Sequence, residues 1–203
     1  MRKSIEDLKN VTVEDALNHP NWDMGSKVTI DSSTMMNKGL EVIEAHWLFG
    51  LSKSKIDVVV HPQSIVHSMV EFVDGNIKAQ LSLPDMKLPI QYALSYPERF
   101  SSKFVNTHFP TLKELTFFEP DLQKFKCLQL AYNSMGEGGT APCILNAANE
   151  IAVEKFLKRE IKFTQIPELI DSALNKIEIK HTLDYETILE CNRKTREFSQ
   201  KFN

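Results

Sequence analysis

Apolar residues recur at helical spacing from Asp121 almost to the C-terminus, and this pattern constrains the fold more than any other feature of the chain. It predicts four helices, near residues 121–135, 141–159, 165–178 and 184–200. Gly136–Gly139 separates the first two, and Thr140 with Pro142 is typical of a helix start. Four amphipathic helices with short connections predict a small helical bundle.

The N-terminal residues mix strand and helix patterns instead. Lys27–Asp31 (KVTID) and Ile56–Val60 are short β-branched runs, and we expect each to be a strand. Lys38–Phe49 has apolar residues at helical spacing and is followed by Gly50, so it predicts a helix that stops at this glycine. Ile65–Val73 and Ile77–Leu83 predict two antiparallel strands, because the Asp-Gly pair between them is a strong hairpin signal.

These patterns predict an α+β fold with an antiparallel sheet, followed by a helical domain. We place a first domain at residues 1–95 and a C-terminal helical domain at 121–203. Residues 96–120 are rich in proline and aromatic side chains and lack clear periodicity, which is typical of an ordered connector.

Composition and charge exclude several classes of protein. The 203 residues include 24 Lys and Arg and 27 Asp and Glu, so no basic surface for nucleic acid is expected. No apolar run approaches the roughly 18–20 residues needed to cross a bilayer. The opening MRKSIEDLKN lacks the apolar stretch of a signal peptide. Three cysteines isolated in sequence predict reduced thiols in a cytoplasmic protein: Cys127, Cys143 and Cys191.

The densest polar cluster is Asp31–Glu41 (DSSTMMNKGLE), which we expect at a junction between a strand and a helix. Asn37, Lys38 and Glu41 are spaced three and four residues apart, so they share one helix face. Such a face could hold a phosphate at the helix start and a metal ion one turn later. The alternative is a Ser/Thr cap followed by a solvated Lys–Glu pair.

Two other regions are candidate functional elements. His61 and His67 bracket the start of a strand, where a histidine could donate a proton or be a half-buried structural residue. The loop His19–Gly25 carries Trp22 and Met24 between Pro and Gly, so it could close over a ligand or be pinned to the core. The chain carries no dinucleotide-binding fingerprint, and we interpret Gly136–Gly139 as a turn between helices.

The chain contains three long motifs: HPNWDMGSKVTIDSSTMMNKGLEVIEAHWLF, HPQSIVHSMVEFVDGNIKAQLSLPDM and LNAANEIAV. Together they resemble the 1-deoxy-D-xylulose 5-phosphate reductoisomerase family. The resemblance implies a homodimeric enzyme that converts 1-deoxy-D-xylulose 5-phosphate, a sugar phosphate, into 2-C-methyl-D-erythritol 4-phosphate in isoprenoid biosynthesis. It also implies NADPH and Mg²⁺ or Mn²⁺ as cofactors, and an amino-terminal part of this chain that is a fragment of the catalytic domain.

The resemblance further assigns roles within the polar cluster. Ser32, Asn37 and Lys38 are similar to the family's phosphate ligands, and Glu41 is similar to a carboxylate ligand of the metal. Lys38 and Glu41 would accordingly belong to the catalytic residues.

Residues outside the cluster also match family positions. His19 is similar to a loop histidine near the substrate, and Trp22 and Met24 to a mobile flap that contacts it. His67 resembles a histidine beside the substrate, so His19 and His67 complete the implied catalytic set. Met86 is similar to the residue that packs near the nicotinamide ring.

The sequence also departs from the family pattern. The family's other acidic metal ligands and its NADPH-binding domain lie upstream of the part that matches, so we expect this chain alone to be inactive. A non-catalytic dimerisation or regulatory module derived from the enzyme is the alternative. A purely structural helical adaptor is disfavoured by the intact cluster at Ser32–Glu41.

Overall fold

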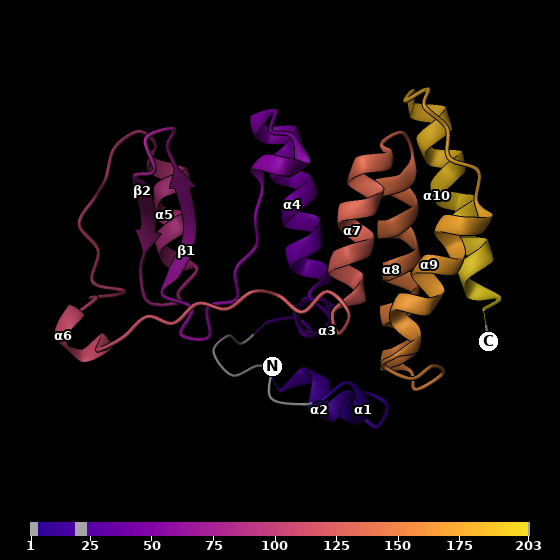
Figure 1. The fold of residues 1–203 in the computed structure, drawn as a ribbon, viewed down its shortest axis with the longest axis horizontal. Helices are drawn as coiled ribbons and strands as arrows, with labels where there is room; N and C mark the ends of the chain where they lie inside the picture. Colours follow the sequence, from indigo (N-terminus) through magenta and orange to yellow (C-terminus); the bar gives the residue numbers. More distant parts are fainter. Residues whose placement is uncertain (1–3, 19–23, 203) are drawn as a thin grey trace. The chain divides into compact units, whose positions relative to one another are not determined.

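The computed structural model describes residues 4–18 and 24–202 (Figure 1). Contacts divide the chain into two compact units, residues 1–58 with 120–203 and residues 59–119. No helix of the described part is both long and apolar enough to cross a membrane. The fold is α+β, as predicted: one unit is helical and the other contains an antiparallel two-stranded sheet.

In the described residues of the first unit, the regular elements are all helices. They are α1 (Ile5–Leu8), α2 (Val13–Leu17), α3 (Ser26–Thr34), α4 (Met36–Phe49), the 3₁₀ helix η1 (Lys53–Lys55), α7 (Lys126–Glu137), α8 (Ala141–Leu157), α9 (Gln165–Lys176) and α10 (Tyr185–Gln200). In Figure 1, α7 lies between α4 and α8, and α9 and α10 pack on α8. The predicted bundle of four C-terminal helices is therefore confirmed.

Helix α8 is the centre of this unit and contacts α3, α7, α9 and α10. Ile144, Leu145, Ile151 and Val153 are almost fully buried, and alanines fill much of the rest of its surface. Small side chains let four helices approach one helix closely, so α8 is apolar nearly all round rather than amphipathic.

The turn before α8 is shorter than the predicted Gly136–Gly139, because Gly136 and Glu137 still belong to α7 and only Gly138 and Gly139 lie in the turn. Gly138 and Gly139 both have positive φ. A Cβ at Gly139 would lie 2.5 Å from the carbonyl oxygen of Lys180. The Thr140 hydroxyl accepts a hydrogen bond from the Lys180 N–H at 3.0 Å, which fixes the start of α8 to the segment before α10.

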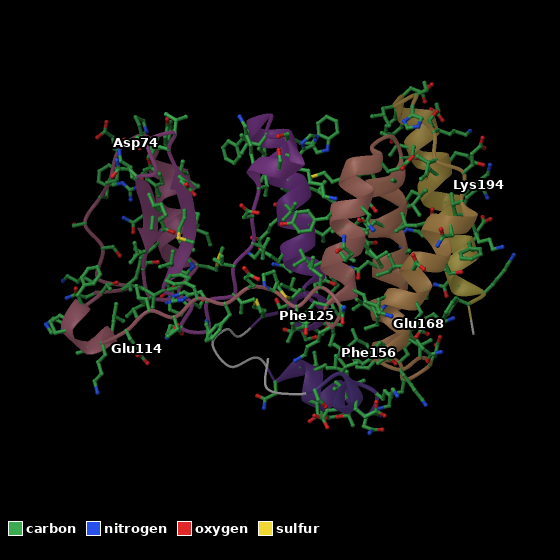
Figure 2. All side chains as sticks on the ribbon, viewed as in Figure 1. Asp74, Glu114, Phe125, Phe156, Glu168 and Lys194 are labelled. Atoms are coloured by element: carbon green, nitrogen blue, oxygen red, sulfur yellow. The ribbon has the colours of Figure 1, made fainter. Side chains whose placement is uncertain are left out.

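The second unit contains β1 (Val66–Glu71), β2 (Ile77–Leu81), α5 (Lys87–Ser95) and α6 (Phe109–Leu112). The strands pair antiparallel, from Val66 opposite Leu81 to Glu71 opposite Ile77. Asp74 lies at the hairpin turn (Figure 2), where its Oδ1 accepts the Asn76 N–H at 3.0 Å. The predicted hairpin is therefore confirmed.

The expected strand at Lys27–Asp31 is wrong, because this segment lies within α3. A helix places the side chains of this segment where they can be buried or paired. Ile30 is completely buried, Lys27 pairs with Asp31 one turn away, and the Thr29 hydroxyl donates to the Gly25 carbonyl at 3.1 Å. Tertiary burial on α7 and α8 overrides the β-branched composition.

The expected strand at Ile56–Val60 is also wrong. Only Val60 pairs, in an isolated bridge with Phe118. The Ile56 carbonyl instead accepts the Tyr132 hydroxyl at 3.2 Å, so this backbone group is bound to α7 rather than to a neighbouring strand.

The contact units group residues differently from the domain boundaries at 95 and 120 that we expected. Helices α1 to α4 pack with the C-terminal helices, so both ends of the chain build the first unit. The division into domains at 1–95, 96–120 and 121–203 stays a prediction.

Helices α4 and α7 touch at a glycine. A Cβ at Gly39 would lie 2.5 Å from the Ala131 Cβ, well inside contact distance. We expect Gly39→Ala to lower the free energy of unfolding by about 1–3 kcal/mol, because overpacking must push the two helices apart. Urea unfolding followed by circular dichroism measures this change.

Gly136→Ala is the matched control, since a Cβ there meets nothing within 4 Å. It should stabilise α7 by about 0.5–1 kcal/mol through helix propensity alone. Adding Ala131→Gly to Gly39→Ala should recover part of the loss. Equal stability of both single variants would contradict the close contact.

Candidate functional site

The polar cluster Asp31–Glu41 lies where α3 meets α4, rather than at the strand–helix junction that we expected. Met35 between the helices has φ 60 and ψ 16, a left-handed conformation that is uncommon for a residue other than glycine. The Thr34 hydroxyl lies 3.2 Å from the Ile30 and Asp31 carbonyl oxygens and accepts the Met36 N–H at 3.3 Å. Thr34 therefore joins the last turn of α3 to the first residue of α4.

The predicted shared face on α4 is confirmed. The Asn37 Nδ2 donates to Glu41 Oε1 at 2.8 Å, and the Lys38 ammonium is paired with Glu41 Oε2. The side chains of Lys38 and Glu41 are 40% and 45% exposed, so a ligand could reach both. One face thus presents an amide, an ammonium and a carboxylate within the first two turns of a helix.

Ser32 lies on the preceding helix and is half-buried. Its carbonyl accepts the Met35 N–H at 3.2 Å, which helps close the turn. The N-terminus of α4 carries partial positive charge from its backbone N–H groups. A serine hydroxyl on one helix, and an amide and a lysine at the start of the next, form a set of donors suited to a phosphate or another anion.

Asp31, the first residue of the cluster, is only 1% exposed. Its Oδ2 pairs with the Lys27 ammonium at 2.5 Å, and its Oδ1 accepts the Asn149 Nδ2 at 2.9 Å. Asn149 is fully buried in α8, 118 positions away in sequence. This hydrogen bond ties the helix that carries Ser32 to the central helix of the unit.

The sequence reasoning missed this pair. Asn149 lies between Leu145 and Val153, one turn away on either side and both buried. A polar side chain on an apolar helix face requires a hydrogen-bond partner, and that requirement was the available signal. Nothing in the local sequence identified Asp31 as the partner.

The other expected site residues are not all placed in this unit. His67 and Met86 belong to the second unit, where His67 Nε2 lies 3.1 Å from the Ser82 carbonyl oxygen and Met86 is 56% exposed. Met24 is half-buried, and its carbonyl accepts the Thr29 hydroxyl at 3.4 Å. His19 and Trp22 lie outside the described residues.

A neighbouring histidine has a structural environment. His61 Nδ1 lies 2.8 Å from the Thr116 carbonyl oxygen, and its ring stacks on Phe117 with centroids 4.6 Å apart. These contacts connect residues far apart in sequence within the second unit, and they favour the structural interpretation of His61.

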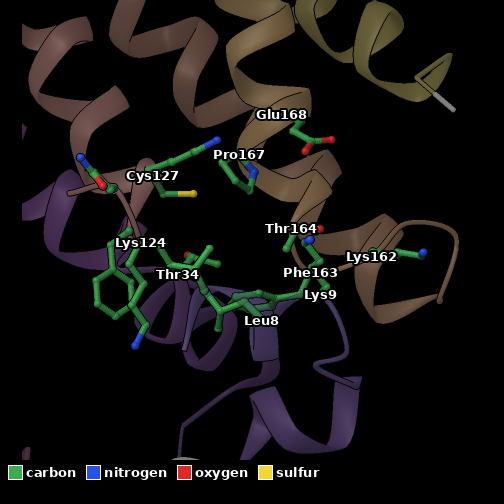
Figure 3. Close-up of a pocket in the computed structure, with 14 residues that line it drawn as sticks. Leu8, Lys9, Thr34, Lys124, Cys127, Lys162, Phe163, Thr164, Pro167 and Glu168 are labelled. Atoms are coloured by element: carbon green, nitrogen blue, oxygen red, sulfur yellow. The ribbon is translucent and has the colours of Figure 1, made fainter. Parts of the chain in front are cut away.

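Behind the α3–α4 junction lies a cavity of about 330 Å³ (Figure 3). Thr34 and Cys127 both line it. Burial raises the pKa of the Cys127 thiol to about 12. A hydrogen bond with Thr34 lowers this pKa, and the nearby Asp31 carboxylate raises it, but burial is the largest cause. Cys127 is therefore protonated at neutral pH and is not poised as a nucleophile.

Two family models match the chain. The DXP reductoisomerase C-terminal domain matches residues 81–198, and the 1-deoxy-D-xylulose 5-phosphate reductoisomerase C-terminal domain matches residues 1–49. The first alone spans more than half of the chain. The chain belongs to the DXP reductoisomerase family.

Curated relatives support this family assignment. The 1-deoxy-D-xylulose 5-phosphate reductoisomerases of Chloroherpeton thalassium and Pelotomaculum thermopropionicum are 57% and 56% identical, over 94% and 97% of this chain. These matches cover 49% and 51% of the relatives, so the chain spans about half of their length and corresponds to the C-terminal portion.

Solved structures share the fold. A DOX-P reductoisomerase in complex with NADPH, fosmidomycin and magnesium has a TM-score of 0.93 and 47% identity, over 98% of this chain and 51% of that one. The Zymomonas mobilis reductoisomerase in complex with NADPH has a TM-score of 0.90 and 39% identity, over the same shares.

The Asp31–Asn149 hydrogen bond can be tested by removing one partner. We expect Asn149→Leu to lower the free energy of unfolding by about 1–3 kcal/mol, because a buried carboxylate loses a hydrogen-bond donor. Urea unfolding provides the measurement. Asn146→Leu is the control on the same helix, since Asn146 is half-buried and its Nδ2 donates to Glu150 Oε1 one turn away at 3.1 Å.

A double-mutant cycle with Asp31→Leu then isolates the pair. The two losses should be clearly non-additive, with a coupling energy of about 1–2 kcal/mol. Additive losses would mean that the two side chains do not support one another.

Proposed function

We propose that this chain is the C-terminal part of an NADPH-dependent reductoisomerase that converts 1-deoxy-D-xylulose 5-phosphate into 2-C-methyl-D-erythritol 4-phosphate. The observation that carries the proposal is the polar face of α4, where Asn37, Lys38 and Glu41 contact one another. The high sequence identity to relatives named 1-deoxy-D-xylulose 5-phosphate reductoisomerase also supports the proposal. Alone, the chain would bind the substrate's phosphate without completing turnover.

The phosphate would be held by donors at the α3–α4 junction. Lys38 supplies a charge, Asn37 and Ser32 supply neutral donors, and the helix dipole of α4 adds to the field. Because Lys38 now pairs with Glu41, an arriving phosphate would compete for its ammonium and release the carboxylate. Phosphate binding would thus prepare Glu41 for a second ligand.

Glu41 is the proposed metal ligand, with Mg²⁺ or Mn²⁺ as the cation. The described residues contain no group of three or more His, Cys, Asp or Glu able to hold a metal ion, so they do not form a complete site. A hard cation such as Mg²⁺ requires several oxygen ligands, and Glu41 offers one carboxylate. The chain by itself should therefore hold the ion weakly.

The proposed NADPH contact is limited to Met86. This side chain is exposed and apolar, which suits packing against a ring, but no phosphate-binding glycine motif accompanies it in the sequence. We propose His67 and His19 as residues near the substrate, and Trp22 and Met24 as parts of a closing loop.

The three cysteines are free thiols, which supports a cytoplasmic location. The alternative function, a dimerisation or regulatory module without catalysis, would use the exposed hairpin surface, which a homodimeric enzyme would use as well. Met69, Val70 and Ile77 in the hairpin are all more than 40% exposed, which is typical of a surface that another chain covers.

The enzyme proposal is tested by supplying the half of the relatives' length that this chain does not span. The chain is joined to the N-terminal half of the Chloroherpeton thalassium relative, and NADPH oxidation is followed with 1-deoxy-D-xylulose 5-phosphate and Mn²⁺. We expect turnover in the joined protein and none in the chain alone. A joined protein that folds, binds phosphate and remains inactive would favour the non-catalytic module.

Two variants of the joined protein separate the roles on α4. Glu41→Gln should lower kcat by about 100-fold or more, because a charged metal ligand is lost, while phosphate binding survives. Lys38→Ala should mainly raise KM, because it removes a phosphate contact. Glu44→Gln, on an exposed position of the same helix, is the control and should leave both constants unchanged. Near-normal activity and metal dependence of Glu41→Gln would restore the interpretation of a solvated Lys–Glu pair.

We also propose a homodimer that covers the β1–β2 hairpin. An isolated two-stranded hairpin is marginally stable, and its exposed apolar side chains need a partner surface. Sedimentation at tens of micromolar should show a dimer, and Val70→Glu, at a position 58% exposed, should shift it to monomer. A wild-type chain that sediments only as monomer would count against the proposal.

A further inference from the structure

The cavity behind the α3–α4 junction has not been assigned a role. Helix α1, the end of α3, the segment entering α7, and the loop and first turn of α9 line it, and it is partly open to solvent (Figure 3). Leu8, Phe125, Phe163 and Pro167 give it largely apolar walls. Its volume of about 330 Å³ is at the lower end of the range for small-molecule sites.

The charged residues around the cavity are mostly basic. Lys9, Lys124, Lys126 and Lys162 line it, against the single carboxylate of Glu168. Lys9 already has an acidic partner on α1, and the Lys124 ammonium lies 5.3 Å from the Phe125 ring centroid. In the part of the chain that the structure describes, Lys126 and Lys162 take part in none of the ion pairs.

An apolar cavity with excess lysine selects one class of ligand. An apolar body gains free energy by leaving water, and an anionic head at the rim gains from the lysines. A neutral apolar molecule would forgo the second contribution, and a cation would be repelled. The protonated Cys127 thiol in the wall carries no charge, so it does not oppose an anion.

We propose that this cavity binds an anion with a short apolar body, such as a medium-chain carboxylate or an alkyl phosphate. Thr34 links it to the polar cluster, since its side chain lines the cavity while its hydroxyl holds the Met36 N–H. A bound ligand packs against Thr34, restricts its rotation and stabilises the start of α4. Phosphate affinity at Asn37 and Lys38 then rises when the cavity is filled.

The binding claim is tested with octanoate and hexyl phosphate on the 203-residue chain, using amide shifts in two-dimensional NMR. Shifts should saturate at Thr34, Cys127 and Phe163 with either anion, and octanamide should bind at least about threefold more weakly because it lacks the charge. Binding of only one anion identifies the head group as carboxylate or phosphate. Shifts confined to the exposed hairpin, or equal affinity for octanamide, would overturn the proposal.

Variants distinguish binding in the cavity from non-specific binding elsewhere on the chain. Lys126→Ala with Lys162→Ala should weaken anion binding about three- to tenfold, with little effect on octanamide. Lys176→Ala, an exposed lysine at the far end of α9, is the control and should change nothing. Leu8→Trp should fill the cavity and abolish saturation, and its circular dichroism must match the parent. Unchanged binding in the folded Leu8→Trp chain would place the ligand elsewhere.

The link to the cluster rests on the proposed phosphate site, so it has its own readout. Inorganic phosphate is titrated with and without saturating octanoate, and the phosphate dissociation constant should fall about threefold with octanoate bound. Thr34→Val should remove this change while octanoate still binds. Octanoate binding without any effect on phosphate would overturn the link only. Failure of phosphate to bind at all would instead contradict the proposed function.

Discussion

The carboxylate of Asp31 is nearly excluded from water, and the arrangement of the candidate site depends on how it is held. An ionised group at this depth is tolerated only with hydrogen-bonding and charged partners. Lys27 supplies the charge from one turn away on α3, and Asn149 supplies a donor from the centre of α8. Because Ser32 follows Asp31 directly, the same contact that satisfies a buried charge also fixes the helix that presents the serine.

A second constraint is the close approach of α4 and α7 at Gly39. The glycine lies two residues before Glu41, so the helix that carries the polar face is held against α7 along its apolar side. Packed helices resist small displacements, because interiors are filled about as densely as organic crystals. The polar face thus rests on rigid packing, while the Lys38 and Glu41 side chains stay partly exposed and free to exchange partners.

Much of the fold and part of the candidate site could be predicted from the sequence, because they depend on local patterns of residues. The four C-terminal helices and the hairpin have strong local signals: periodic apolar residues in the first case and Asp74-Gly75 in the second. The spacing of Asn37, Lys38 and Glu41 likewise fixed their common face. The strand prediction for Lys27–Asp31 was wrong because it relied on the local β-branched composition. Burial of this segment against α7 and α8 decided its structure, and no local pattern reveals that burial. The Asp31–Asn149 contact and the cavity at Thr34 join segments far apart in sequence, so they required coordinates.

The bridge between Val60 and Phe118 has a consequence for how the chain is assembled. These residues lie just inside the two ends of the second unit, and their backbones exchange hydrogen bonds at 2.8 and 2.9 Å. Residues 59–119 therefore enter and leave at neighbouring points, in the manner of an insertion within a host domain. The host helices meet across this excursion at little extra entropic cost, since closure entropy grows only slowly with loop length. A change of length inside residues 59–119 would therefore leave unchanged the neighbouring points at which this unit joins the rest of the chain.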